Sequence, residues 1–274
     1  MTDLSVLRGM PLTELKLHDC PDLTDLAPLA EMKSLKDLTL PPNAKDIDFL
    51  RTLPKLARIS FKADRQSDDR PKQTAAEFWK EYDTQGWVRA LRAAGIDTSK
   101  VRQWDDGTWD VRLEGSAISD LTILSGAPIN QLWLGGTAIT NLQPLRGMAL
   151  KYLRIFNTKV TDLSPLKGIP LHSLHMSGTK VTDLSPLRGM PLRNLKLHEC
   201  PNLIDLSPLA DCKGLKSLTL PPNAKNIEFL RTLPNLERLS FKEERKGWMP
   251  DKTAAEFWRE YDAKKREATP RETP

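Results

Sequence analysis

The sequence predicts an α/β solenoid, a stack of short turns of chain that share one continuous core. The first reason is a skeleton, apolar-x-x-Leu-x-apolar, which begins at Ile129, Leu150, Leu171 and Leu192 with a spacing of 21 residues. The second reason is that apolar and polar residues alternate within each skeleton, which is typical of a short strand with one buried face. A fixed period of this size indicates that each turn buries its apolar side only against its neighbours.

Composition is compatible with such a fold and restricts the kind of protein. The chain has 274 residues, of which 39% are hydrophobic and 28% charged, which is typical of a folded domain. We find no apolar run of 18 residues and no signal peptide, so we expect no membrane partner. Three cysteines form no disulfide pattern, and together these features favour a cytoplasmic location for the chain as given. The net charge of +5 permits an acidic partner without implying nucleic acid.

The segment before residue 62 carries the same repeat in a slightly longer form. Its skeletons begin at Leu12, Leu35 and Leu56, so their spacing varies between 21 and 23 residues. We expect a strand at each skeleton. Proline-containing turns after the first two strands, at 20–22 and 41–43, have the residues that reverse the chain.

A break in the pattern follows. Residues 62–73 are polar and predict a surface loop. Thr74 with Glu77 three positions later resembles a capping box, so a helix should run through Tyr82. A second helical stretch, 87–94, should end at Gly95. We expect the apolar side chains of both helices to form one face that closes the end of a solenoid: Phe78, Trp79, Tyr82, Trp87 and Leu91.

The repeat then resumes. Residues 101–114 predict a hairpin around the turn sequence Asp105-Asp106-Gly107. Its second strand merges with the next skeleton, so the hairpin should start a second solenoid. We expect the strands of that solenoid near 131–134, 152–155, 173–176, 194–197, 217–220 and 238–241.

The end of the chain duplicates its beginning. Residues 12–61 align with 192–241 without a gap, and 35 of the 50 aligned positions are identical. The helical sequence 74–82 recurs at 253–261. We therefore predict a partial repeat unit with a capping helix at 1–82, a complete unit with caps at both ends at 83–266, and a flexible tail at 267–274.

The phrases Asp162-Leu-Ser-Pro-Leu166 and Asp183-Leu-Ser-Pro-Leu187 within this pattern resemble the short leucine-rich repeats of bacterial proteins, similar to the internalin type. Together with Glu256-Phe-Trp-Arg-Glu-Tyr261, they look like repeat regions attached to bacterial serine/threonine protein kinases. The chain has no glycine-rich phosphate loop, no His-Arg-Asp and no Asp-Phe-Gly, so at most it resembles a non-catalytic part of such proteins.

The resemblance implies leucine-rich repeats with a parallel sheet on the concave side and short 3₁₀ turns on the convex side. Ser164-Pro165 and Ser185-Pro186 fit this arrangement because proline is favoured at the first position of a helical turn. The alternate strand residues should then point out of the concave face. The central exposed column would contain Lys16, Thr39, Ser60, Arg112, Trp133, Arg154, His175, Lys196, Thr219 and Ser240.

Aromatic and basic residues gather in this column and beside it. Strands about 4.8 Å apart would bring them within reach of one partner, and tryptophan, tyrosine and arginine are typical of interface hot spots. An alternative is that the aromatic side chains cover one another and the charges are simply solvated. The predicted binding patch contains Trp133, Tyr152, Arg154, Phe156, His175, Lys196 and His198.

Other kinds of site find less support. His175 and His198 should lie on adjacent strands, but no Cys, Asp or Glu completes a metal site at a useful spacing. No serine has a recognisable base partner, so we expect no enzyme activity and no cofactor. Nucleic-acid binding would need a denser basic stripe.

The sequence thus predicts a non-catalytic scaffold that holds a protein or peptide on its concave face. The alternative is a structural, self-associating segment of a longer tandem array. That alternative rests on Leu4, Leu7 and Leu12, which start the chain in the middle of a repeat and leave an uncapped edge.

Overall fold

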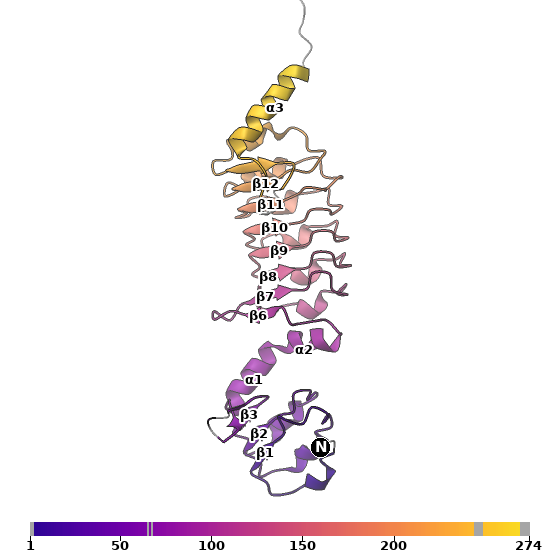
Figure 1. The fold of residues 1–274 in the computed structure, drawn as a ribbon, viewed down its shortest axis with the longest axis vertical. Helices are drawn as coiled ribbons and strands as arrows, with labels where there is room; N and C mark the ends of the chain where they lie inside the picture. The colour runs from indigo at the N-terminus through magenta and orange to yellow at the C-terminus, as the bar shows by residue number, and fades with distance from the viewer. Residues whose placement is uncertain (1–2, 65, 67, 244–248, 269–274) are drawn as a thin grey trace, which may run out of the picture. The chain divides into compact units, whose positions relative to one another are not determined.

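In the computed structural model the chain forms two compact units, one reaching to Gly86 and the other beginning at Trp87. The structure describes residues 3–64, 66, 68–243 and 249–268 (Figure 1). Each unit is a stack of turns in which strands lie on one side and short 3₁₀ helices on the other. The chain is therefore a leucine-rich-repeat solenoid in each of its two parts, as the repeat period predicts.

Among its described residues, the first unit has a sheet of three parallel strands and three 3₁₀ helices. Strands β1 (Glu14–Lys16), β2 (Asp37–Thr39) and β3 (Arg58–Ser60) pair in that order. The 3₁₀ helices that precede them are η1 (Ser5–Leu7), η2 (Ala27–Glu31) and η3 (Asp48–Thr52). The register places Leu15 beside Leu38 and Leu38 beside Ile59, so the apolar residue at the centre of each strand stacks on the next.

The segment 62–73, predicted as a surface loop, includes regular structure among its described residues. It contains β4 (Ala63–Asp64) and β5 (Arg70–Pro71), which pair as a short antiparallel ribbon. Arg58 in β3 stabilises this ribbon because its guanidinium donates two hydrogen bonds to the carbonyl of Pro71, at 3.0 and 2.9 Å. The sequence does not indicate this contact, since the segment is polar and has no strand-like alternation.

Helix α1 (Ala75–Thr84) confirms the predicted capping box. The Thr74 hydroxyl accepts the Glu77 N–H at 3.3 Å, and the Thr74 N–H donates to the Glu77 carboxylate at 2.9 Å. The Thr74 hydroxyl also donates to this carboxylate, at 2.8 Å, and the two bonds that the carboxylate accepts lower the pKa of Glu77. The helix packs Phe78 against Phe61 at the end of the stack, with 5.7 Å between the ring centroids.

The predicted single apolar face of the two helices is wrong. Phe78, with Trp79 and Tyr82 packed around it, belongs to the core of the first unit. Helix α2 (Gly86–Ala93) contributes Trp87 and Leu91 to the core of the second unit, where Trp87 meets Trp109 edge-on at 5.1 Å. A turn of chain at Gln85 separates the two helices and lets each close a different core.

The second unit contains one eight-stranded sheet in the order β13-β12-β11-β10-β9-β8-β7-β6. The predicted hairpin is confirmed: β6 is antiparallel to β7, and every later pair is parallel. Its strands are β6 (Val101–Gln103), β7 (Trp109–Arg112), β8 (Ile129–Trp133), β9 (Tyr152–Arg154), β10 (Ser173–His175), β11 (Asn194–Lys196), β12 (Ser217–Thr219) and β13 (Arg238–Ser240).

The opposite side of the second unit carries six 3₁₀ helices among the described residues. They are η4 (Thr122–Leu124), η5 (Gln143–Leu145), η6 (Ser164–Leu166), η7 (Ser185–Leu187), η8 (Ser207–Asp211) and η9 (Ile227–Thr232). Helix α3 (Ala254–Ala268) closes the C-terminal end as α1 does in the first unit: Phe257 packs on Phe241 at 5.7 Å.

The predicted flexible tail, 267–274, falls partly on α3. Residues 267 and 268 belong to that helix, and 269–274 lie outside the described residues. Within the part of the chain that the structure describes, no helix is both long enough and apolar enough to cross a membrane.

Substitutions at equivalent positions of the duplicated segment can show how much a neighbouring turn contributes to the stability of each unit. Leu195 in β11 is 1% exposed beneath β10, whereas its counterpart Leu15 in β1 is only half-buried. We expect Leu195→Ala to lower the free energy of unfolding of the second unit by about 2–5 kcal/mol, because it leaves a cavity. Leu15→Ala should destabilise the first unit by less.

Urea denaturation followed by hydrogen exchange and mass spectrometry would report the two units separately. Equal losses of stability for Leu15→Ala and Leu195→Ala would contradict the idea that the contribution of this leucine depends on the turn that covers it.

Candidate functional site

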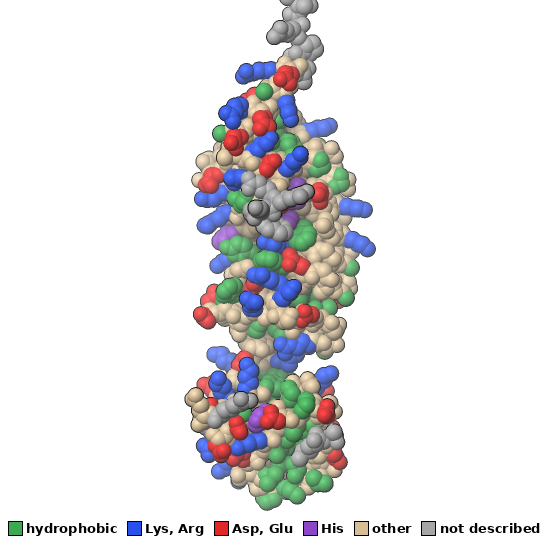
Figure 2. All heavy atoms as spheres, viewed as in Figure 1, with side chains coloured by type: hydrophobic (Ala, Val, Ile, Leu, Met, Phe, Trp, Pro, Cys, Tyr) green, Lys and Arg blue, Asp and Glu red, His purple; other side chains and the backbone are tan. Residues whose placement is uncertain are grey.

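The sheet face of the second unit is the outward surface of strands β8–β11 and of the residues that follow them. The register places Trp133, Arg154, His175 and Lys196 in one row across four adjacent strands. Tyr152 lies two residues before this row in β9, and Phe156 and His198 follow β9 and β11. All seven residues of the predicted patch therefore belong to one run of four turns. Figure 2 shows hydrophobic, basic and histidine side chains interleaved on the second unit.

Trp133 is held between two guanidinium groups. The Cζ atom of Arg112 lies 4.1 Å from the centroid of the indole ring, and that of Arg154 lies 3.7 Å from it. Arg112 is fixed in turn by the buried carboxylate of Asp110, at 2.9 Å. Cation–π contacts of this kind are worth about 0.5–2 kcal/mol each. These contacts fix the orientation of the half-buried indole.

Tyr152 lies beside this arrangement and is the most accessible aromatic side chain of the patch, with 40% of its surface exposed. Its ring meets that of His172 edge-on at 6.4 Å. A phenol of this kind offers both apolar area and a hydroxyl to a partner.

Phe156 extends the aromatic row from the following position. Its ring lies over Gly135, where a side chain would collide with it: a Cβ atom at Gly135 would be 2.2 Å from Cε1 of Phe156. The same ring stacks on His175, with 4.8 Å between centroids. Gly135 is therefore part of the site, although it is not in the predicted patch, because its missing side chain makes room for Phe156.

The prediction that His175 is exposed is wrong. Only 6% of its surface is accessible, because Phe156 covers one side and the His198 ring lies 5.8 Å away on the other. Burial, assisted by the positive charges of Lys196 and Arg154, lowers the pKa of His175 to about 3. The imidazole is therefore neutral at physiological pH and lies stacked within the aromatic row.

The small hydroxyl residues of the predicted exposed column are also buried. Thr219 is 1% exposed because its Oγ1 accepts the backbone N–H of Leu197 at 3.0 Å, and Thr39 accepts the N–H of Leu17 in the same way at 3.0 Å. A short side chain on the sheet face can fold back onto the neighbouring backbone. Ser60 and Ser240, at 3% and 4%, are buried as well.

Lys196 and His198 meet a carboxylate that the sequence does not place at this site. Glu243 lies 2.8 Å from the Lys196 Nζ and 3.6 Å from the His198 Nδ1. Burial lowers the pKa of Lys196, and Glu243 opposes that shift. Glu243 comes three residues after β13, two strands away from β11, so no sequence period links it to Lys196.

The hydroxyl, imidazole and carboxylate groups at this place do not form a catalytic relay. The Ser177 hydroxyl approaches His198 Nδ1 at 2.9 Å, and Thr219 and Glu243 approach the same nitrogen. A nucleophile–base–acid relay requires two different ring nitrogens, one for the hydroxyl and one for the acid. Among the described residues, no group of three His, Cys, Asp or Glu side chains is placed to hold a metal ion.

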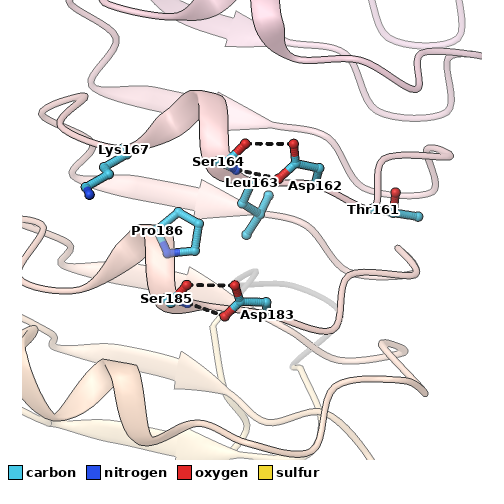
Figure 3. Close-up of a pocket in the computed structure, with 8 residues that line it drawn as sticks. All are labelled: Thr161, Asp162, Leu163, Ser164, Lys167, Asp183, Ser185 and Pro186. Atoms are coloured by element: carbon cyan, nitrogen blue, oxygen red, sulfur yellow. Dashed lines mark hydrogen bonds between the residues drawn. The ribbon is translucent and has the colours of Figure 1, made fainter.

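The opposite side of the unit has a shallow pocket between η6 and η7 (Figure 3). Asp162 accepts the backbone N–H of Ser164 at 2.8 Å and its hydroxyl at 2.7 Å, and Asp183 and Ser185 repeat this arrangement. These bonds lower the pKa of both carboxyl groups. The Asp-Leu-Ser-Pro motif thus begins η6 and η7, and its polar atoms are used for that purpose.

The comparisons with known proteins concern the fold alone. No family model and no curated protein matches the chain. An internalin (inlF) from Listeria monocytogenes is 21% identical, with 80% of this chain and 50% of that chain covered, at a TM-score of 0.44. The functional domain of InlJ from the same organism is 16% identical, with 88% and 55% covered, at a TM-score of 0.35. The chain spans about half the length of both structures.

The contact between Gly135 and Phe156 can be tested by a double-mutant cycle. Gly135→Ala should lower the free energy of unfolding of the second unit by about 1–3 kcal/mol, because the new methyl group displaces the Phe156 ring. In a Phe156→Ala background the same change should have a smaller effect. Urea denaturation of the four variants gives the coupling energy, and additive effects would contradict the contact.

The buried His175 should make stability depend on pH. Its pKa is about 3 in the folded chain, and the ordinary value is 6.5. Between these values the unfolded chain binds a proton that the folded chain does not, so stability falls as the pH is lowered from 6.5. The share of His175 in this slope is at most about 1.4 kcal/mol per pH unit.

The variant His175→Gln should therefore lose stability less steeply than the wild type between pH 6.5 and 4. Denaturation curves at several pH values measure the slopes. The control is His172→Gln, which removes another imidazole, from the residue just before β10. Identical slopes for wild type and His175→Gln would show that the buried imidazole does not titrate as described.

Proposed function

We propose that the chain is a non-catalytic interaction scaffold that binds a protein or peptide on the sheet face of its second unit. The observation that supports this proposal is the indole of Trp133, oriented by Arg112 and Arg154 and flanked by the exposed Tyr152. Interfaces concentrate their binding energy in such tryptophan, tyrosine and arginine side chains. A side chain that is already ordered loses little conformational entropy when a partner binds.

The roles of the seven residues differ in this proposal. Trp133, Tyr152 and Arg154 would contact the partner directly. Phe156 and the buried His175 would support them from the side. Lys196, which Glu243 neutralises in part, and His198 would form the polar rim of the contact. The face carries both positive and negative groups, so a partner of mixed charge suits it better than a polyanion such as nucleic acid.

A second candidate function is assembly through the N-terminal end of the first unit. The observation in its favour is that β1 pairs with β2 on one side and, among the described strands, with none on the other. An open strand edge is a template for pairing with another chain. The resemblance to repeat regions attached to protein kinases remains a prediction, and it is compatible with either function.

A peptide-display selection against the full chain, followed by direct binding of the selected peptide, tests the sheet-face proposal. The double variant Trp133→Ala/Arg154→Ala should bind the peptide at least about tenfold more weakly, which corresponds to about 1.4 kcal/mol or more. Circular dichroism establishes that the variant is folded. Lys167→Ala, on the opposite side of the same unit, is the matched control and should bind as the wild type does.

Selected peptides that bind the double variant as tightly as the wild type would place the binding site elsewhere. Light scattering across a dilution series tests the second candidate, and a mass that does not depend on concentration would count against self-association.

A further inference from the structure

The residues that come just before strands β9–β12 form a column across four turns of the second unit. The backbone N–H of Lys151 donates to the carbonyl of Asn130 at 2.9 Å, and that of His172 donates to the carbonyl of Lys151 at 2.8 Å. The same bond, also 2.8 Å long, joins Arg193 to His172 and Lys216 to Arg193. We call this column, which consists of Lys151, His172, Arg193 and Lys216, the basic edge.

The cations of the basic edge are accessible. Lys151 and Arg193 are exposed, and neither forms an ion pair with another described residue. Lys216 pairs with the exposed Glu237 at 3.3 Å. An exposed ion pair of this kind contributes little, so a partner's carboxylate can replace that of Glu237. Figure 2 shows basic side chains and a histidine along the left edge of the second unit.

Carboxylates limit the basic edge at both ends. Glu237 takes the next position of the column, where its N–H donates to the carbonyl of Lys216 at 2.9 Å. At the other end lies Asp106, in the turn of the β6–β7 hairpin. Hydrogen bonds from Thr108 lower the pKa of Asp106, and the positive charge of Lys151 lowers it further. Because neighbouring strands are about 4.8 Å apart, the basic edge spans about 14 Å.

A second column of polar side chains lies directly beside the basic edge. Tyr152, Ser173 and Asn194 follow its members by one residue and pair in register on adjacent strands. The exposed Tyr152 ring meets that of His172 edge-on, and Ser173 and Asn194 are half-buried. Their hydroxyl and amide groups can both donate and accept hydrogen bonds, as the backbone of a peptide requires.

We propose that the basic edge binds a short acidic segment of a partner protein in an extended conformation. An extended chain advances about 3.3 Å per residue, so about five residues match the span of the edge. Carboxylates of the segment would pair with Lys151, Arg193 and Lys216, and its backbone would bond to the neighbouring polar column. The net charge of +5 favours the approach of such a segment. This inference goes beyond the sheet-face function, because it requires neither Trp133 nor Arg154.

A nucleic acid fits the basic edge less well. Its affinity depends on the neutralisation of many phosphates, and the edge offers three cations within about 14 Å. A phosphate backbone that continued past either end would meet Glu237 or Asp106. A polypeptide can instead place its acidic residues against the edge and uncharged residues beyond it.

The probe for the experiment is a fluorescently labelled hexaglutamate peptide, whose charges repel one another and keep it extended at neutral pH. Fluorescence anisotropy with the full chain measures its binding at low ionic strength. The control peptide is hexaglutamine, which has the same length without the carboxylates. We expect one hexaglutamate to bind per chain, at least tenfold more tightly than hexaglutamine, and its affinity to fall as salt is added.

Two triple variants of the full chain locate the binding surface. Lys151→Gln/Arg193→Gln/Lys216→Gln should weaken the binding of hexaglutamate at least fivefold. The matched control removes the same charge from three exposed lysines of the same unit that follow the strands instead of preceding them, and it should bind within about twofold of the wild type. Its substitutions are Lys159→Gln, Lys180→Gln and Lys225→Gln. Circular dichroism establishes that both variants are folded.

Three results would overturn the inference. The first is equal binding of hexaglutamate and hexaglutamine. The second is an equal loss of affinity in the two triple variants, which would show attraction by net charge alone. The third is tighter binding of single-stranded heptathymidylate, which carries six phosphates, than of hexaglutamate at the same edge, which would identify nucleic acid as the occupant. Trp133→Ala should bind hexaglutamate as the wild type does, so this test is distinct from that of the sheet-face function.

Discussion

The whole structure depends on the stacking of one apolar residue on the same residue of the next turn. No single turn has enough length to bury its own leucines, so each strand takes its stability from the two turns beside it. The parallel register that sets Leu153 beside Leu174 and Leu174 beside Leu195 continues this contact through the second unit. Every other feature, from the 3₁₀ helices to the sheet face, is held in place by that column of leucines.

A stack of this kind requires something at each end. Helix α3 closes the second unit by packing Phe257 on Phe241. Helix α1 closes the first unit by the equivalent contact of Phe78 with Phe61. The other end of the second unit is closed by α2 and the hairpin, where Trp87 packs on Trp109. In the first unit Leu12 and Leu15, next to and within β1, are half-buried.

The sheet face shows how a regular scaffold orders irregular side chains. Residues 21 positions apart are brought to neighbouring strands, so Trp133 and Arg154 meet although they are distant in sequence. The aromatic and cationic side chains along this face contact one another. The buried His175 belongs to the same row, because its neutral imidazole stacks on the ring of Phe156.

The sequence by itself determined the repeat period, the strands, the capping box at Thr74, the hairpin and the duplication, because each is a local pattern or a fixed spacing. It also named the residues that share the sheet face, since the period assigns every residue to a row. Tertiary structure alone decided which of them are accessible. Glu243 reaches Lys196 from two strands away, Phe156 covers His175, and Thr219 turns back onto the backbone. These contacts depend on side-chain direction and on neighbours without a periodic relation, and so no repeat pattern contains them.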